Sequence, residues 1–376
     1  MIKGRIVSNR KRNTIQCEIF KNPNQAWLEE AWCDLEQRST GNFFLSWLWI
    51  GTWIDNFVNE FYVIEARLNN KIVGLGVLVK QPTKYPLSAI KTKYYLHRTG
   101  RQDLDQVWIE YNDFLVDAEN EESIRVAMAK RLVNELDRLD AIVIGASDED
   151  RFSCINEFGL KSRKIWETAN YALDLDELRD KKISVLESLS RNTRSQILRS
   201  IRSYEKIGAI SINKACSIDA AKEMLLQAKP LHLARWKNAG IKSGFTNEKF
   251  VAFHEKIIER GVENKVVELN HIKVGNETIS IIYNFNYKGK IYFYLCGINY
   301  CYKSSHFKPG LVSHYLLINK ALEEGLETYD FMAGEARYKA SFSNRKGTLS
   351  VSQYEVPSKR LEFEGKLREF KQQFIS

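Results

Sequence analysis

The residues best suited to bind a charged ligand surround a Pro-Gly pair late in the chain. Lys308 precedes Pro309-Gly310, and a stretch with helical spacing begins directly afterwards at Leu311. The first turn of a helix leaves backbone N–H groups unpaired, and the helix dipole adds partial positive charge there. Gly310, Leu311 and Val312 are therefore candidate donors to phosphate oxygens, with Lys308 adding charge. An ordinary Pro-Gly turn is the structural alternative.

A second group of candidates could move protons. Asp330 lies within a predicted strand, 328–332, and a predicted short helix at 335–342 carries Glu335, Tyr338 and Lys339. Glu335 or Asp330 could act as a base and Tyr338 as an acid. The structural alternatives are a core carboxylate for Asp330 and a Glu335–Lys339 pair along the helix. His306 and His314 are alternative bases, because histidine titrates near neutral pH.

Arginines recur at helical spacing further upstream. The pattern predicts a long helix over 186–207, with apolar residues on one face and Arg191, Arg194 and further basic residues on the other. Such a face is either solvated or borders an anionic ligand, since guanidinium groups match phosphate oxygens well.

Composition excludes several classes of protein. The 376 residues are 44% hydrophobic and 27% charged, which excludes a wholly disordered chain. Six scattered cysteines exclude a disulfide scaffold, and no ligand spacing predicts a metal site. The net charge of +9 is a mild excess that leaves nucleic-acid binding unlikely on charge alone. The basic segment 1–14 is not followed by an apolar region and the run 42–54 is too short to span a bilayer, so we expect a cytoplasmic protein.

Helices and strands alternate in both parts of the chain. Helices are predicted at 24–37 and 43–57 and a hairpin at 61–79, followed by a mixture of short strands and helices. After the polar junction 176–186, three strands joined by tight turns occupy 265–297. A helix, a strand, a short helix and a last strand then end near residue 356. This order is not that of a doubly wound sheet.

Several motifs resemble the GNAT-type acyltransferase domain of cellulose-biosynthesis (CelD-like, BioF2-like) proteins, which is related to the Fem-type peptidoglycan aminoacyltransferases. The motifs are Phe43-Phe44-Leu45-Ser46, Tyr111-Asn112-Asp113-Phe114-Leu115, Ser190-Arg191-Asn192-Thr193-Arg194, Arg235-Trp236, Phe307-Lys308-Pro309-Gly310-Leu311, Tyr329-Asp330-Phe331-Met332-Ala333-Gly334-Glu335 and Tyr338-Lys339-Ala340-Ser341-Phe342. The block 309–342 is the most specific part.

The resemblance implies an α/β (α+β) fold of two tandem GNAT-like units, each a mostly antiparallel mixed sheet flanked by helices. We expect an N-terminal half at 1–178, an acyltransferase half at 179–356 and a basic C-terminal helix at 357–376. Acyl-CoA would be the co-substrate, without a metal. Its phosphates would meet Lys308, Gly310, Leu311 and Val312.

The resemblance also implies roles around the acceptor. Catalysis would involve Glu335, Tyr338, Lys339 and Asp330, and substrate binding would involve Arg191, Arg194, Arg235, Trp236 and His306. A lysine of this motif contacts the acceptor in Fem-type relatives, which suggests that role for Lys339. No spacing indicates a Ser-His-Asp or Cys-His arrangement, so direct attack on the acyl donor is the simpler mechanism.

The sequence therefore predicts a cytoplasmic acyltransferase that uses acyl-CoA and an amine or hydroxyl acceptor, a small molecule or a glycan, in the synthesis of a cell-surface polysaccharide. One alternative is an aminoacyl-tRNA-dependent transferase, the one case in which nucleic acid would be a partner. The other is a non-catalytic module of a membrane synthase complex, docked through its basic tail and the aromatic segment 43–53. Peripheral membrane association, the acceptor, the acyl length and the oligomeric state are left open.

Overall fold

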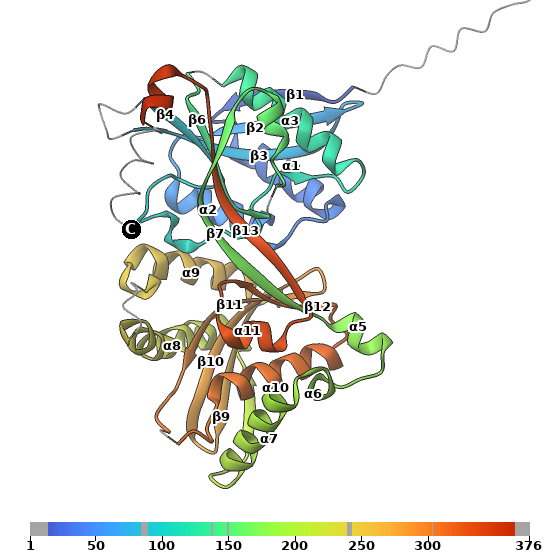
Figure 1. The fold of residues 1–376 in the computed structure, drawn as a ribbon, viewed down its shortest axis with the longest axis vertical. Coiled ribbons are helices and arrows are strands. Elements are labelled where there is room, and N and C mark those ends of the chain that lie inside the picture. Colours follow the sequence, from blue (N-terminus) through green and yellow to red (C-terminus); the bar gives the residue numbers. More distant parts are fainter. Residues whose placement is uncertain are drawn as a thin grey trace, which may run out of the picture.

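The computed structural model describes residues 14–83, 89–136, 138–148, 150–238, 243–302 and 304–364. Within these ranges thirteen strands form a single sheet that runs the length of the molecule (Figure 1). Twelve of them follow the order β1-β2-β3-β4-β6-β13-β7-β12-β11-β10-β9-β8, and β5 pairs with β3. Neighbours are antiparallel except for the pairs β4–β6 and β11–β12. The predicted fold class, a mostly antiparallel mixed sheet flanked by helices, is confirmed.

The strands vary widely in length. They are β1 (Gln16–Lys21), β2 (Tyr62–Leu68), β3 (Lys71–Pro82), β4 (Thr92–Leu96), β5 (Leu115–Val116), β6 (Ala141–Asp148), β7 (Lys161–Asp174), β8 (Ile210–Lys214), β9 (Val267–Val274), β10 (Glu277–Tyr287), β11 (Lys290–Ile298), β12 (Thr328–Ala333) and β13 (Arg345–Glu355).

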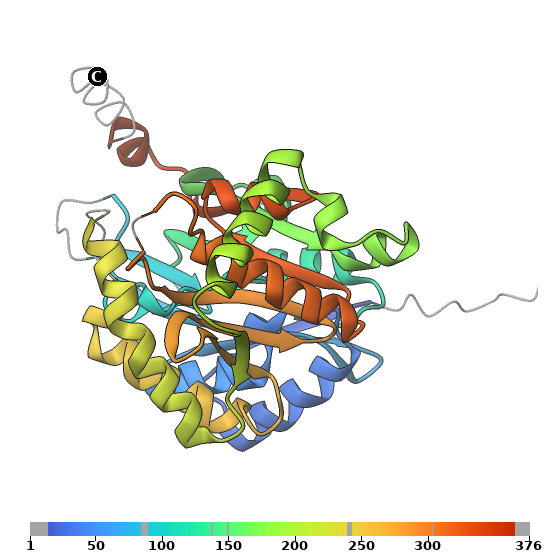
Figure 2. The ribbon, with the colours of Figure 1, turned by 90° about the horizontal axis from the view of Figure 1, so that it is seen from below.

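Helices cover both faces of the sheet. They are α1 (Gln25–Arg38), α2 (Trp47–Phe57), α3 (Glu121–Glu135), α4 (Cys154–Glu157), α5 (Leu175–Asp180), α6 (Val185–Ser188), α7 (Arg191–Glu205), α8 (Ile218–Asn238), α9 (Glu248–Gly261), α10 (Pro309–Glu323) and α11 (Arg337–Phe342). In the second half, α8 and α9 lie on one face and α7 and α10 on the other (Figure 2).

The two halves exchange their last strands. β13, from the end of the second half, lies between β6 and β7 of the first half. β7 in turn pairs with β12 of the second half. Both strands cross the waist of the molecule (Figure 1). The boundary between residues 178 and 179 stays a prediction, and the sheet is continuous across it.

Aromatic side chains from both halves share one core. The ring of Phe43 stacks on Phe285 with centroids 3.9 Å apart, and Trp49 meets Phe253 edge to face at 5.0 Å. Phe43, Trp49 and Phe253 are at most 1% exposed. The predicted docking role of the segment 43–53 is therefore wrong, because most of its aromatic rings are buried in the core that joins the two halves.

Two helices differ from their predicted bounds. The helix predicted over 186–207 is divided into α6 and α7, because Ser190 caps a new helix by accepting the Thr193 N–H (3.2 Å). The short helix predicted from Glu335 begins at Arg337, because Gly334 has a φ of 116° and turns the chain out of β12 first.

The ends of the chain are only partly described. A helix begins at Lys359 and continues to Glu364, and the rest of the predicted C-terminal helix lies outside the described residues, as does most of the basic N-terminal segment. In the described part of the chain no helix is both long and apolar enough to cross a membrane.

The exchanged strand β13 leaves no room for a side chain at position 145 of β6. A Cβ at Gly145 would lie 2.5 Å from the Cα of Val351, and the φ of 148° is already unfavourable for other residues. We expect Gly145→Ala to lower the free energy of unfolding by roughly 3 kcal/mol, from backbone overlap plus strain. Gly159→Ala is the control: its φ is 94° but its surroundings are open, so it should cost about 1 kcal/mol. Urea unfolding of both variants checks this, and equal losses would contradict a tight β6–β13 contact.

Candidate active site

The sheet opens where β11 and β12 separate. These parallel strands pair only from Lys290 with Thr328 to Tyr292 with Asp330. Beyond this point β11 continues for six residues, while β12 continues to Ala333 beside β7. The carboxyl ends of two diverging parallel strands form a crevice in which α/β proteins commonly bind ligands.

The first half has the same topology but its crevice is closed. β4 and β6 also pair at three positions, from Lys93 with Ala141 to Tyr95 with Val143. There the fully buried Asn112 donates hydrogen bonds to the Leu96 carbonyl (2.8 Å) and to the Gly145 carbonyl (3.2 Å). Its side chain bridges the two strands and occupies the position that a ligand would need.

A cluster of charged groups lies at the end of β12. The Ala333 N–H donates to Glu110 Oε2 (2.8 Å), and Lys339 Nζ donates to the Ala333 carbonyl. Lys339 is 9% exposed and belongs to α11, whereas Glu110 comes from the first half. The structure thus brings together a carboxyl group from the first half of the chain and an ammonium group from the second half.

Burial changes the proton affinities of this cluster. It raises the pKa of Glu110 to about 7, although the Ala333 N–H and Lys339 act in the opposite direction. It raises the pKa of Asp330 to about 6. Burial also lowers the pKa of Lys339, while the negative charges of Glu110 and Asp330 act in the opposite direction. Glu110 can therefore accept a proton at neutral pH.

Asp330 also forms part of a hydrogen-bonded wall. Tyr111 Oη donates to Asp330 Oδ1 (2.8 Å), the Met332 N–H donates to the same oxygen (2.7 Å), and Asn170 Nδ2 donates to Tyr111 Oη (3.1 Å). Beside this wall, the cleft between the halves has a volume of about 420 Å³. Among its lining residues are the cations Arg125, Arg151, Lys290 and Arg345.

The motif that begins at Tyr111 has three separate structural roles. Tyr111 contacts Asp330, Asn112 closes the first crevice, and Asp113 accepts two hydrogen bonds from the buried Arg125 (2.8 and 2.7 Å). Glu110 stands immediately before it. We call residues 97–114, which carry all of these groups, the strap.

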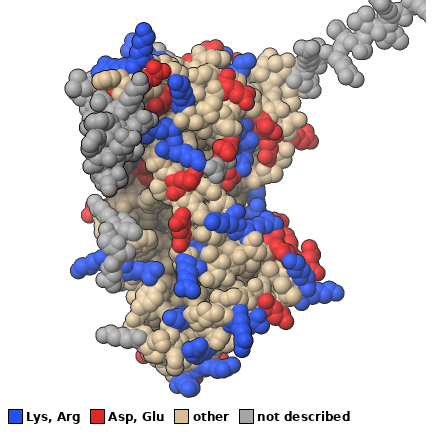
Figure 3. Space-filling model, in the orientation of Figure 1, with Lys and Arg blue, Asp and Glu red and all other residues tan. Residues whose placement is uncertain are grey.

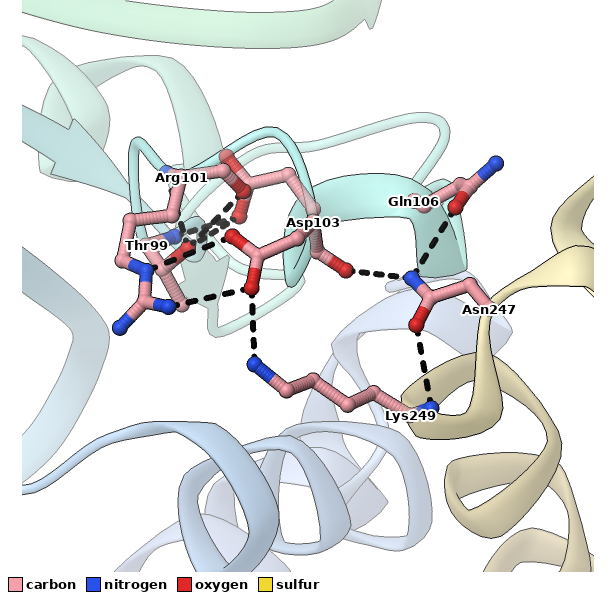
Figure 4. Close-up of polar contacts among 7 residues, drawn as sticks. Thr99, Arg101, Asp103, Gln106, Asn247 and Lys249 are labelled. Atoms are coloured by element: carbon pink, nitrogen blue, oxygen red, sulfur yellow. Dashed lines mark hydrogen bonds and ion pairs between the residues drawn. The ribbon is translucent and has the colours of Figure 1, made fainter. Parts of the chain in front are cut away.

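The strap is tied to α9 of the second half (Figure 4). Asn247 Nδ2 donates to the Asp103 carbonyl (2.6 Å) and to Gln106 Oε1 (3.0 Å), and Lys249 Nζ pairs with Asp103 Oδ2 (2.8 Å). Further along, Tyr294 Oη donates to the Val107 carbonyl (2.5 Å). These contacts position the strap just before Glu110.

The start of α10 has two of the three predicted free donors, the N–H groups of Gly310 and Leu311. The Val312 N–H already donates to the Lys308 carbonyl (3.0 Å), so it is not free to bind a ligand. Pro309 occupies the first turn, and no side chain caps the helix among the described residues. A Cβ built on Gly310 would have no atom within 4 Å, so a ligand can approach the backbone of Gly310 and Leu311. The Lys308 N–H is already used, because it donates to Ser200 Oγ of α7 (2.9 Å).

The other predicted residues are dispersed. Arg191 is exposed, while Arg194 Nη2 donates to the Leu189 carbonyl at the α6–α7 junction (3.3 Å). Trp236 Nε1 donates to His232 Nε2 (2.7 Å), and His306 is exposed in the loop before α10. Val312 is fully buried within α10.

Tyr338 lies near the crevice and is partly buried, whereas Glu335 lies on the surface. The Tyr338 ring stacks on His314 at 5.0 Å, and burial raises the pKa of Tyr338 well above its usual value. Arg235 acts electrostatically on Tyr338 and also donates to Tyr300 Oη (3.1 Å). Burial lowers the pKa of His314 to about 3, so this histidine is neutral at physiological pH. Glu335 is exposed.

The sequence prediction missed Glu110 and Asn170. Neither spacing nor charge marks them, because Glu110 is separated by more than two hundred residues from the strand that it contacts. The motif at Tyr111–Leu115 was the available signal, since it indicated that polar residues are required at this position.

Residues 191–340 match the family model described as the acetyltransferase (GNAT) domain. This segment contains α7 through most of α11, and with it β11, β12, α10 and the predicted ligand donors. No curated protein sequence matches the chain. Within the described ranges, no group of three or more His, Cys, Asp or Glu side chains could hold a metal ion.

Three solved structures are similar over nearly the whole chain. FemX has a TM-score of 0.57 at 14% identity, with 89% of this chain and 96% of FemX covered. A conserved protein of unknown function from Bacteroides thetaiotaomicron has a TM-score of 0.53 at 11% identity, with 91% of this chain and 100% of that protein covered. The C-terminal domain of a protein from Agrobacterium fabrum that is named as a putative lysylphosphatidylglycerol synthetase has a TM-score of 0.53 at 8% identity, with 88% of this chain and 92% of that domain covered. The chain therefore shares their fold.

The attachment of the strap to α9 can be tested with Asn247→Asp. Aspartate keeps the oxygen that caps α9 but cannot donate to the Asp103 carbonyl or to Gln106. Loss of these two bonds should increase hydrogen exchange of residues 99–111 roughly tenfold or more, with α9 unchanged. Lys256→Met, which removes an exposed partner of Glu259 on the same helix, should leave the strap unchanged. Equal exchange in the wild type and Asn247→Asp would show that these bonds do not hold the strap.

Proposed function

We propose that the protein is an acyltransferase that moves an acyl group from acyl-CoA to an amine or hydroxyl group. The observation that carries this proposal is the match of residues 191–340 to the GNAT domain, together with the open crevice at the end of β12. The acceptor is proposed to belong to a cell-surface glycan, and the reaction to take place in the cytoplasm.

The donor is proposed to bind along the start of α10. Gly310 and Leu311 offer backbone N–H groups, the helix dipole favours phosphate oxygens, and the open space at Gly310 allows a close approach. Lys308 contributes charge through its side chain. Arg191 on α7 and His306 in the preceding loop are proposed to meet the outer part of the substrates.

The groups around β12 suit direct transfer. A bond forms between the acceptor atom and the acyl carbon, and the carbon–sulfur bond of the thioester breaks. Glu110, with its pKa near neutral, is proposed to take the proton that the acceptor loses. Tyr338 keeps its proton at neutral pH and is proposed to give it to the leaving thiolate. Lys339 supplies positive charge beside the reacting groups, with Asp330 as its second carboxyl neighbour.

Glu335 remains the predicted base from the sequence, and Glu110 is the base that the geometry favours. Burial distinguishes the two, because Glu335 is exposed, whereas burial raises the pKa of Glu110 to about 7. Arg194, Arg235 and Trp236 are proposed to shape the substrate site from α7 and α8.

Donor binding is tested at Gly310. Gly310→Asp places a carboxylate where phosphate oxygens would lie, so acetyl-CoA and longer acyl-CoAs should bind at least tenfold more weakly in calorimetric titrations. Gly310→Ala is the matched control and should bind normally, because the added methyl group meets open space. Unchanged affinity in a folded Gly310→Asp variant would place the donor elsewhere, and no binding by the wild type would overturn acyl-CoA as the donor.

The role of Glu110 predicts a distinctive response to pH. Its raised pKa means that the folded wild type loses stability as pH rises from about 4.5 through about 7. Glu110→Gln should not lose this stability, so its melting temperature should rise relative to that of the wild type as the pH increases from about 4.5 to about 7. With an amine acceptor, its release of CoA should fall about 10²–10⁴-fold. Glu335→Gln is the comparison, and a larger loss of rate there would return the base to Glu335.

A further inference from the structure

One edge of β7 has no neighbour beside the active site. β7 is paired with β13 from Ala172 with Arg345 to Lys161 with Glu355, which is all but its last two residues. On its other side β12 pairs only as far as Asn170, and the last bond runs from the Gly334 N–H to the Ala169 carbonyl (2.9 Å). No described strand adds to β7 beyond that bond.

Gly334 creates this vacancy. Its φ of 116° turns the chain out of the sheet, and α11 begins three residues later. Because the N–H and C=O of one strand residue point to the same side, those of Ala169 point toward β12, where the carbonyl accepts the Gly334 N–H. Those of Glu167, two residues further on, point to the same side and face the vacancy. Ile165 and Trp166 are 48% and 39% exposed, so this part of β7 is accessible. The surface is hollowed at the waist that β7 crosses (Figure 3).

The vacant position starts at the charged cluster. Ala333, the last residue of β12, contacts Glu110 through its N–H and Lys339 through its carbonyl. A chain that continued the path of β12 past Gly334 would run antiparallel to β7, away from the cluster and toward Lys161. Its amino end would lie next to Glu110 and Lys339.

The geometry restricts the occupant to a short chain. The pairing of β7 with β13 shifts register between Trp166 and Lys164, and such a bulge twists the strand. Charged Lys164 and Arg163 follow it, and bulges and charges discourage the addition of another sheet edge. The regular stretch open to pairing is therefore Trp166–Ala169, which is about 13 Å long at 3.3 Å per residue.

We propose that the free edge of β7 at Trp166–Ala169 binds the first residues of a peptide acceptor by strand addition, with its N-terminal amine presented to Glu110. This inference rests on the acyl transfer proposed above and names a peptide amine, in place of the glycan, as its acceptor. The amine nitrogen forms an amide bond with the acyl carbon, and the thioester carbon–sulfur bond breaks. One amine proton passes to Glu110, and the CoA thiolate takes a proton from Tyr338 and leaves as the thiol. Main-chain hydrogen bonds to Glu167 supply the affinity.

The test uses a pentapeptide amide of alternating alanine and glutamate with a free amino terminus. Glucosamine is the comparison, because it has an amine but no peptide chain. The peptide should slow hydrogen exchange of the Glu167 N–H at least fivefold, and should be acylated at least tenfold faster than glucosamine. A version of the peptide methylated on alternate amide nitrogens should lose both effects.

Two variants of β7 separate the backbone from the side chain. Glu167→Pro removes the outward N–H without touching the β13 ladder, and it should abolish the rate advantage of the peptide. Glu167→Ala keeps the N–H and should retain that advantage. If Glu167→Pro fails to fold, the methylated peptide still decides the question.

The outcomes distinguish this inference from the proposed function. Equal acylation of peptide and glucosamine, without protection of Glu167, would overturn the strand-addition site and leave the acyltransferase intact. Protection of Glu167 without any acylation would support the peptide site and overturn the proposed reaction. Equal binding of the methylated and unmethylated peptides would also overturn strand addition.

Discussion

The short length of β12 is the constraint on which the site depends. β12 has only three residue pairs with β11, and Gly334 removes it from the sheet while β7 continues. One consequence is the crevice beside β11, into which the N–H and C=O of Ala333 point. The other is the unpaired edge of β7. Both openings meet at the same residue, so a donor and an acceptor can approach it from different sides of one strand.

The exchanged strands explain why the site needs both halves. β13 completes the sheet of the first half and β7 completes that of the second, so neither half has its full set of strands alone. The aromatic core around Phe43 and Phe285 is likewise shared. The strap therefore lies against well-packed parts of both halves. Glu110 can therefore be held against Ala333 by a segment without regular structure over most of its length.

The sequence predicted the local structure better than the site. Alternating patterns and tight turns located β9, β10 and β11, and helical spacing located α10, because these signals depend on neighbouring residues. The division at Ser190 was missed, since a serine suits both a helix interior and a cap. β7 has fourteen residues, and its first part shows no apolar pattern that would mark a strand, because it is exposed on both faces. Glu110 was missed because its environment is created entirely by long-range contacts.

Residues of the strap close the crevice of the first half and leave the crevice of the second half open. Both halves place a pair of parallel strands with three paired positions in the same topology. In the first half, Asn112 satisfies its amide by bridging the strands, which leaves the crevice filled by a neutral, hydrogen-bonded side chain. Two residues earlier, Glu110 reaches the second crevice and retains a titratable carboxyl group there. Both positions therefore belong to one continuous segment, which bridges the strands of the first crevice with Asn112 and borders the second crevice with Glu110.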